Sequence, residues 1–288
     1  MNPPTMDICS HSIRTVECED GYSLGYRVWF PGDGPLAALF LVSGMMSHSG
    51  WFGTLASALS ESRLKVIGAD RRGSGLNEGD RGDALSRHLL VSDLLRIVEQ
   101  EDSGAPIYLV GWCWGAALAI NAALELGGKV SGVALLAPGL FPSERIRDAM
   151  RRDSTPPKNT QLGSCRVQSP LTAEMFTDVL EFQEFIAHDD LAVRTFTTRF
   201  IQVSQQMQLV AITRLTRLIG PVLLLLAAKD QTVDNAKTSV AFQRLPAESL
   251  TSATLSCNHG MQFEAPRELA TRITEWVHST VPARKGMR

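Results

Sequence analysis

The sequence predicts a protein of the α/β class, in which helices cover both faces of a mostly parallel sheet. Short apolar runs alternate along the chain with longer segments of helical period. The short runs lack the in-and-out alternation of a strand with one face in water, so both faces of the sheet are expected to be covered. The alternation stops between residues 141 and 218, which predicts a helical insertion, or cap. We therefore expect core segments at 1–140 and 219–288 and a cap at 141–218.

Five apolar runs rich in β-branched residues are the expected buried strands: Leu36–Ser43, Lys65–Ala69, Pro106–Gly111, Val130–Ala137 and Val222–Ala228. Three segments of helical period are the expected helices: Trp51–Ser62, Asp83–Asp102 and Trp114–Leu126. Their order predicts parallel strands joined by right-handed crossovers. Near the start, Ser12–Cys18 and Tyr22–Phe30 alternate in hydropathy, which predicts an antiparallel hairpin joined at Glu19–Gly21.

The predicted cap holds two helical patterns and no strand. It opens with Pro142 and a basic stretch, and a loop with Pro156 and Pro157 follows. Ser169–Pro170 favours a helix start, because serine is a good N-cap and proline fits the first helical position. One apolar stripe then recurs at helical spacing: Phe196, Phe200, Val203, Met207 and Val210. The alternative is that these helices are ordinary crossovers of the sheet.

Composition excludes several classes of protein. The 288 residues carry 28 basic and 30 acidic side chains, so the basic charge of a nucleic-acid-binding protein is missing. The longest apolar run, between Arg217 and Lys229, has eleven residues and is too short to span a bilayer. The N-terminus lacks the pattern of a secretory signal. The cysteines are Cys9, Cys18, Cys113, Cys165 and Cys257. Their spacing fits no disulfide framework or metal site, so we expect a reducing cytoplasm, no metal and no cofactor.

The segment Gly111-Trp112-Cys113-Trp114-Gly115 follows an expected strand and opens an expected helix. This is the glycine–x–nucleophile–x–glycine layout of a nucleophile elbow, with cysteine where serine usually stands. Glycines are needed because a side chain at either flank of so tight a turn would clash. The turn holds its nucleophile at the carboxyl edge of the sheet. We therefore predict Cys113 as the nucleophile, and a buried structural cysteine is the alternative.

Asp230 and His259 complete the predicted catalytic set. Asp230 follows the strand Val222–Ala228, whose carboxyl end shares a rim with the elbow. A histidine can take the thiol proton or hold a thiolate as an ion pair, while an aspartate fixes its tautomer and stabilises the imidazolium. Asp234 is the alternative acid, although a helix N-cap suits it better. A position in a surface loop is the alternative for His259.

Two backbone N–H groups are expected to stabilise a developing oxyanion. Trp114 follows the nucleophile at a helix N-terminus, so its N–H can face the negative oxygen. The loop after the strand Leu36–Ser43 faces the nucleophile in such an elbow, and Met45 is predicted to give the second N–H. His48 in this loop is a candidate substrate contact, and packing within the loop is its alternative.

These features together resemble the α/β-hydrolase superfamily, whose enzymes use the chain order nucleophile, acid, histidine. The resemblance is strongest to the monoacylglycerol-lipase or lysophospholipase-like branch, the serine aminopeptidase S33 group, and extends from about residue 20 to 280. It rests on Ser43-Gly44, His48-Ser49-Gly50-Trp51, Asp70-Arg71-Arg72-Gly73-Ser74-Gly75 and Gly79-Asp80-Arg81-Gly82. The resemblance implies an eight-stranded sheet, a helical cap between strands six and seven, and acyl transfer through a covalent intermediate.

Three departures from that branch stand out. Ser43 stands where histidine usually precedes the oxyanion glycine, and Asn77 replaces an expected serine. The nucleophile is Cys113, and its neighbours are the bulky Trp112 and Trp114 in place of the histidine and methionine typical of the branch.

A sulfur nucleophile favours thioester substrates. A thiol has a pKa of about 8.5 against roughly 15 for an alcohol, so the thiolate leaves a tetrahedral intermediate more readily than an alkoxide does. The tetrahedral intermediate formed from an oxygen ester therefore tends to return to substrate. With a thioester, both possible leaving groups are thiolates of similar basicity. The acyl-cysteine can then pass its acyl group to an amine, an alcohol, a thiol, a carbanion or water.

The predicted substrate-pocket residues are Met46, His48, Trp112, Met175, Phe176 and Phe200. The tryptophans of the elbow would exclude water if they line the pocket, and the alternative is that they fill space beneath the cap or behind the helix. The apolar side chains of the cap form either an acyl tunnel or the cap's own core.

We hypothesise an acyl-transfer enzyme with a Cys113–His259–Asp230 triad. It would accept an acyl group from a coenzyme A or carrier-protein thioester and transfer, cyclise or hydrolyse it. Cysteine elbows of this kind resemble those of enzymes that off-load polyketide and peptide assembly lines, including Dieckmann-type cyclases. The alternatives are a carboxylester or monoacylglycerol-type hydrolase and a non-catalytic binding protein of the same fold.

Overall fold

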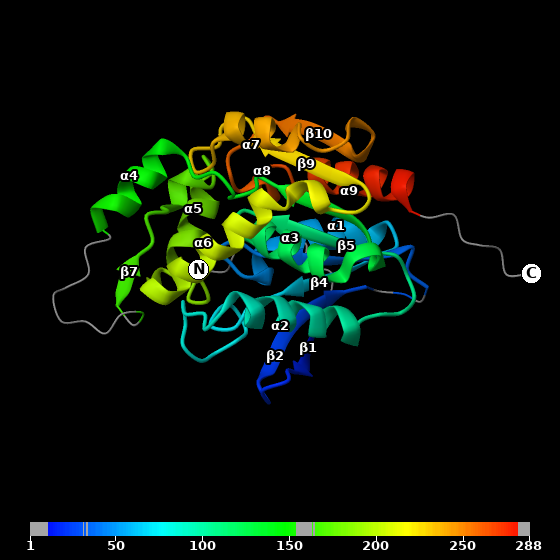
Figure 1. The fold of residues 1–288 in the computed structure, drawn as a ribbon, viewed down its shortest axis with the longest axis horizontal. Coiled ribbons are helices and arrows are strands. Elements are labelled where there is room, and N and C mark those ends of the chain that lie inside the picture. The colour runs from blue at the N-terminus through cyan, green and yellow to red at the C-terminus, as the bar shows by residue number, and fades with distance from the viewer. Residues whose placement is uncertain (1–10, 31, 33, 154–162, 164, 282–288) are drawn as a thin grey trace, which may run out of the picture.

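The computed structural model describes residues 11–30, 32, 34–153, 163 and 165–281. At its centre is an eight-stranded sheet with the strand order β1-β2-β4-β3-β5-β6-β9-β10 (Figure 1). The strands are β1 (Ser12–Glu17), β2 (Ser23–Trp29), β3 (Ala37–Val42), β4 (Leu64–Ala69), β5 (Ile107–Trp112), β6 (Val130–Leu136), β9 (Val222–Ala227) and β10 (Leu250–Leu255). β2 pairs antiparallel with β1 and β4, and all other neighbours are parallel. The predicted hairpin and the eight-stranded, mostly parallel sheet are confirmed.

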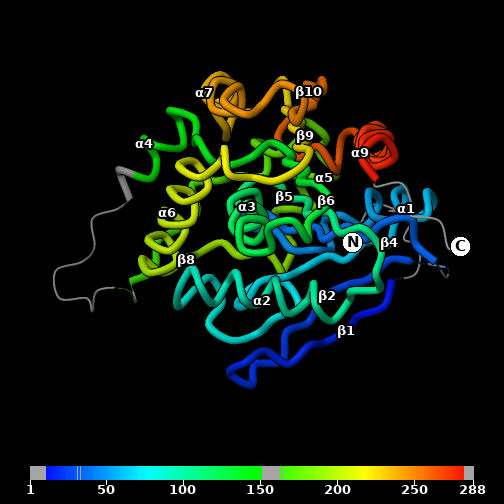
Figure 2. Tube along the Cα trace, turned by 45° about the vertical axis from the view of Figure 1, so that its right-hand side comes forward, coloured from blue at the N-terminus to red at the C-terminus, as the bar shows by residue number. Residues whose placement is uncertain are grey.

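Helices pack against this sheet on both faces (Figure 2). They are α1 (Gly53–Glu61), α2 (Arg87–Gln100), α3 (Gly115–Leu126), α7 (Asn235–Phe242), α8 (Met261–Glu264) and α9 (Pro266–Thr280). α1 packs against α9, and α2 packs against α3. Every residue of β3, β5 and β9 is buried as a result, which explains why these strands read as continuous apolar runs. Among the described helices, none is both long and apolar enough to cross a bilayer.

A smaller group of elements lies between β6 and β9 and gathers at the left of Figure 1. It comprises α4 (Glu144–Asp153), β7 (Arg166–Gln168), α5 (Leu180–His188), β8 (Thr195–Thr197) and α6 (Thr198–Thr213). The predicted cap boundaries at residues 141 and 218 fall between β6 and β9. The predicted loop containing Pro156 and Pro157, like the first ten residues, lies outside the described residues.

Two predictions for this region are wrong. β7 and β8 form an antiparallel pair, although no strand was expected there. Ser169–Pro170 starts no helix. The Ser169 N–H donates to the Arg194 carbonyl and so continues the β7–β8 pairing. The Ser169 hydroxyl accepts a hydrogen bond from the Leu171 N–H. Both strands have only three residues, too few for a periodic signal.

Candidate active site

Cys113 lies at a sharp turn between β5 and α3. Its φ of 55° is in the left-handed region, which a side chain other than glycine rarely adopts. The glycines beside it are sterically required: a Cβ on Gly111 would lie 2.6 Å from the Ala116 Cα, and a Cβ on Gly115 would lie 2.3 Å from the Val42 oxygen. The tight strand–turn–helix geometry predicted for residues 111–115 is therefore present, and the lack of space at both glycines explains it.

His259 and Asp230 form a buried, hydrogen-bonded pair. The His259 Nδ1 lies 2.7 Å from the Asp230 Oδ2, and both side chains are fully buried. Asp230 follows β9 and also accepts hydrogen bonds from the Thr232 and Val233 N–H groups and from the Thr232 hydroxyl. Asp234, the alternative acid, instead caps α7 by accepting a bond from the Lys237 N–H.

Charge and burial act in opposite directions on this pair. Burial lowers the pKa of His259, but the Asp230 carboxylate and then the Cys113 sulfur outweigh it and raise that pKa to about 10. Burial likewise opposes ionisation of Asp230, but the His259 imidazolium and the hydrogen bonds lower its pKa. Among the described residues, the buried Nε2 of His259 has no polar partner other than the Cys113 sulfur. The structure thus brings together all three predicted triad residues, with Asp230 at one ring nitrogen of His259 and the Cys113 sulfur at the other.

The two predicted oxyanion donors, Met45 and Trp114, line the same cavity as Cys113. Within the described part of the chain, neither backbone N–H donates a hydrogen bond. Gly139 contributes to this opening, because a Cβ there would lie 3.1 Å from the Trp114 nitrogen. Gly139 was not predicted as a site residue, and the signal for it is a glycine shortly after the strand that neighbours the turn at Cys113.

Two adjoining cavities lie at this site, and the inner one is lined by Cys113. One of about 80 Å³ reaches Cys113, and another of about 460 Å³ extends outward beneath α4 and α6. Apolar side chains shared by both are Met45, Pro142, Met150, Pro170 and Ile201. The outer cavity adds polar groups that the inner one lacks, among them Arg147, Gln168 and Gln202. The space beside Cys113 is therefore apolar and grows more polar away from it.

None of the six predicted substrate contacts is among the residues that line these two cavities. Trp112 is buried and donates its indole N–H to the His259 carbonyl, and its ring packs against His259 and Phe176. Phe200 stacks on Trp114, 5.5 Å away between ring centroids. Met46 and Met175 are buried elsewhere. These side chains pack between the cap and the core, so they support the walls of the site from behind and do not face the cavities.

His48 also has a structural partner. Its Nε2 lies 2.9 Å from the Asp189 Oδ2, and its Nδ1 accepts a bond from the Gly50 N–H. The Gly50 bond assigns the proton to Nε2, so the neutral imidazole donates to Asp189. His48 thereby connects the loop after β3 to the cap.

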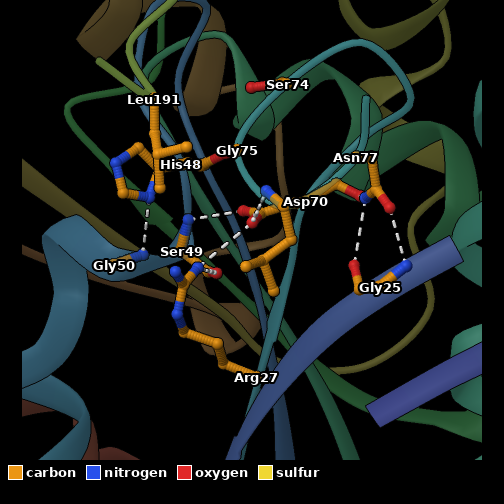
Figure 3. Close-up of polar contacts among 12 residues, drawn as sticks. Gly25, Arg27, His48, Ser49, Gly50, Asp70, Ser74, Gly75, Asn77 and Leu191 are labelled. Atoms are coloured by element: carbon orange, nitrogen blue, oxygen red, sulfur yellow. Dashed lines mark hydrogen bonds and ion pairs between the residues drawn. The ribbon is translucent and has the colours of Figure 1, made fainter. Parts of the chain in front are cut away.

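A polar cluster around Asp70 holds that loop in place (Figure 3). Asp70 accepts hydrogen bonds from the N–H groups of Ser49, at 2.5 Å, and Leu76, and pairs with Arg27. Asn77, one of the departures noted in the sequence, bonds to both the N–H and the carbonyl of Gly25. Asn77 thus has a structural role, since its amide oxygen accepts from the Gly25 N–H and its amide nitrogen donates to the Gly25 carbonyl.

Known proteins resemble this chain in both sequence and fold. Monoglyceride lipase of Homo sapiens is 37% identical over 122 residues, which cover 41% of this chain and 40% of that protein. The alignment thus spans less than half the length of this curated relative. A soluble variant of monoglyceride lipase from Saccharomyces cerevisiae superposes with a TM-score of 0.82 at 15% identity, covering 98% of this chain and 99% of the other.

A thioesterase domain from the curacin biosynthetic pathway has a TM-score of 0.66 at 15% identity, with 93% of this chain and all of the other covered. At such identities the structural likenesses show the fold alone. The family model described as serine aminopeptidase, S33, matches residues 33–266. The chain therefore belongs to the serine aminopeptidase S33 family and is an α/β-hydrolase of the monoglyceride-lipase-like branch.

Proposed function

We propose that this chain hydrolyses carboxylic esters with an apolar acyl group, through an acyl-thioester intermediate on Cys113. The observation that carries the proposal is the position of Cys113, which lines an apolar cavity and lies beside the buried His259–Asp230 pair. Membership of the S33 family and the similarity to monoglyceride lipases support an ester as the substrate. They favour the hydrolase alternative over the carrier-linked acyl transfer suggested by the sulfur atom alone.

The proposed reaction has two halves. In the first, His259, whose pKa is raised to about 10, holds the Cys113 proton, so the sulfur attacks the ester carbonyl from an ion pair with the imidazolium, and the Met45 and Trp114 N–H groups stabilise the oxyanion. Collapse of this intermediate breaks the bond between the carbonyl carbon and the alcohol oxygen, and the alcohol leaves with the proton from His259. In the second half, His259 takes a proton from water, the hydroxide attacks the thioester, and Cys113 leaves as its thiol.

Hydrolysis or transfer of a thioester-linked acyl group is the second candidate function. Sulfur favours it, because the entering and leaving groups have matched basicity in a thioester but not in an oxygen ester. A coenzyme A or carrier-protein thioester would then be the acyl donor, and the acceptor would be water, a second nucleophile, or a carbanion of the same chain.

The decisive experiment pairs a nitrophenyl ester with a thioester of the same medium-length acyl chain. The wild-type protein is expected to hydrolyse the ester and to carry an acyl adduct on Cys113 in intact-protein mass spectra. Cys113→Ala should lose both, whereas Cys165→Ala, a cysteine outside the site, should keep both. Turnover that survives in Cys113→Ala overturns the proposal.

The Cys113→Ser variant separates the two candidate functions. For this comparison the ester is an alkyl ester of the same acyl chain. Turnover of it that holds or improves with serine supports the carboxylester hydrolase, since its alkoxide leaving group is then displaced by a group of similar basicity. A wild-type preference for the thioester of about 100-fold or more, lost in the serine variant, supports the thioester function instead.

A further inference from the structure

Arg71 is a buried cation behind the proposed oxyanion hole. It follows Asp70 after β4 and is only 6% exposed. Its Nη2 donates to the Met45 carbonyl at 2.6 Å, and its Nη1 donates to the Gly44 carbonyl at 3.4 Å. The next residue, Arg72, instead forms ion pairs with Asp20 and Asp93. Among the described residues, no carboxylate lies within ion-pair distance of Arg71.

The same guanidinium also contacts the elbow. Its Cζ lies 5.1 Å from the ring centroid of Trp114 and 5.0 Å from that of Phe200. The Trp114 indole is fixed in turn by a bond from its N–H to the Ser204 hydroxyl on α6. Arg71 therefore touches both residues whose backbone N–H groups we assign to the oxyanion hole, Met45 through its carbonyl and Trp114 through its ring.

We infer that Arg71 is a positioning residue that aligns and polarises the oxyanion hole of this chain. The inference rests on the proposed function, because it concerns the same reacting centre. The Gly44 carbonyl and the Met45 N–H belong to one peptide group, so a cation bonded to that carbonyl makes the N–H a stronger donor. A positive charge with no carboxylate bonded to it also stabilises a nearby oxyanion, most strongly in a buried site of low dielectric.

The side chain remains charged at its site. Burial and the neighbouring Arg81 lower the pKa of Arg71, Asp70 raises it, and the result of about 9 leaves the guanidinium protonated at neutral pH. The buried Nε has no hydrogen-bond partner among the described residues, so part of the charge is not neutralised by protein acceptors. A structural arginine would be expected to use this donor.

The test compares Arg71→Met, which removes the charge, with Arg71→Lys, which keeps it without the planar fork. Arg71→Met should lower kcat for the ester by about 10- to 100-fold while KM changes by less than about threefold. Its affinity for an aldehyde analogue of the acyl group, which forms an oxyanion-like thiohemiacetal on Cys113, should fall by a similar factor. Arg71→Lys should give intermediate losses.

Two controls separate positioning from general damage. Alkylation of Cys113 by iodoacetamide forms no oxyanion, so its rate should fall by a much smaller factor than kcat in both variants. Arg72→Met should lower the melting temperature, because it breaks two ion pairs, and leave kcat unchanged.

Two outcomes for Arg71→Met would overturn the inference. One is a variant with wild-type kcat and wild-type affinity for the aldehyde, and the other is a variant that loses alkylation and turnover by the same factor. If Arg71→Met does not fold, an Arg71→Lys variant with wild-type kcat would overturn it. If the wild-type protein hydrolyses no ester or thioester, the proposed function fails. The aldehyde affinity then still tests Arg71.

Discussion

At the scale of single residues, the Asp230–His259 pair depends on burial and on the bonds around it. Both side chains are out of contact with water, where their mutual attraction is strong but desolvation is costly. Three further hydrogen bonds to Asp230, from two N–H groups and the Thr232 hydroxyl, offset part of that cost. The carboxylate is therefore held ionised and oriented before any substrate arrives.

Asp230→Asn should lower kcat by between about 10²- and 10⁴-fold, because the imidazole loses its charged partner. It should also lower the His259 pKa. Since that pKa is raised above its ordinary 6.5 in the wild type, the stability it contributes is fully present below about pH 6.5 and is lost as pH rises toward about 10. Urea unfolding should show a wild-type advantage of about 3 kcal/mol near pH 6 that shrinks toward pH 10.

The matched control is Asp234→Asn, since asparagine caps a helix as well as aspartate does. This variant should keep both activity and stability. Equal activity losses in the two variants would contradict the assignment of Asp230.

The proximity of Cys113, His259 and Asp230 was predictable because each follows a strand or turn that the sequence marks. The pocket was not. Trp112 and Phe200 have the right chemistry for a pocket, but the direction of a bulky side chain depends on what the cap packs against it, which single-sequence patterns do not contain. Arg71 was quoted only as part of a motif, because its partners are backbone carbonyls from a loop distant in sequence.

At the scale of elements, the loop after β3 is joined to the cap through the segment after α5. The Val193 N–H donates to the Met46 carbonyl at 2.8 Å, and the Trp51 indole N–H donates to Asp189 at 2.6 Å, beside the bond from His48. Met45, one of the proposed oxyanion donors, is adjacent to these contacts. The position of the cap is therefore coupled to that of the loop that carries Met45.

Asp189→Ala should loosen both segments at once. Two buried donors, on His48 and Trp51, would lose their acceptor, which costs about 1 to 3 kcal/mol for each. Hydrogen exchange should quicken in residues 46–52 as well as 189–193, and kcat should fall about 10- to 100-fold as Met45 moves. Asp190→Ala, at the exposed neighbouring position, should change neither. Faster exchange confined to 189–193 would refute the coupling.

The central strands could be predicted to within one or two residues, because both faces of each are buried and the apolar signal is continuous. β10 has the opposite character: it lies at the sheet edge, is largely exposed, and was expected only from the family resemblance. β7 and β8 escaped prediction because their pairing joins segments about thirty residues apart, and such non-local pairing leaves no local pattern.

At the scale of the whole molecule, Glu101 joins the antiparallel edge of the sheet to its parallel centre. This buried carboxylate at the end of α2 accepts bonds from Arg14 on β1 and Tyr26 on β2, and pairs with Lys65 on β4 at 2.8 Å. The family match begins at residue 33, after β1 and β2. Glu101 thus anchors the N-terminal hairpin to the part of the chain that the family shares.

Glu101→Gln should lower the free energy of unfolding at neutral pH by about 2 kcal/mol, since the bonds to charged partners weaken. Burial opposes ionisation, but Lys65 and Tyr26 outweigh it and lower the Glu101 pKa. The stability from a lowered carboxyl pKa is present above its ordinary value of 4.5 and is lost as pH falls through the folded-state value. The difference between wild type and variant should therefore shrink between about pH 5 and about pH 3 in urea titrations. The control is Glu99→Gln, at an exposed position on the same helix, whose free energy of unfolding should show no such pH-dependent difference from the wild type. If the difference between Glu101→Gln and the wild type stays constant with pH, this carboxylate does not couple the hairpin to the core.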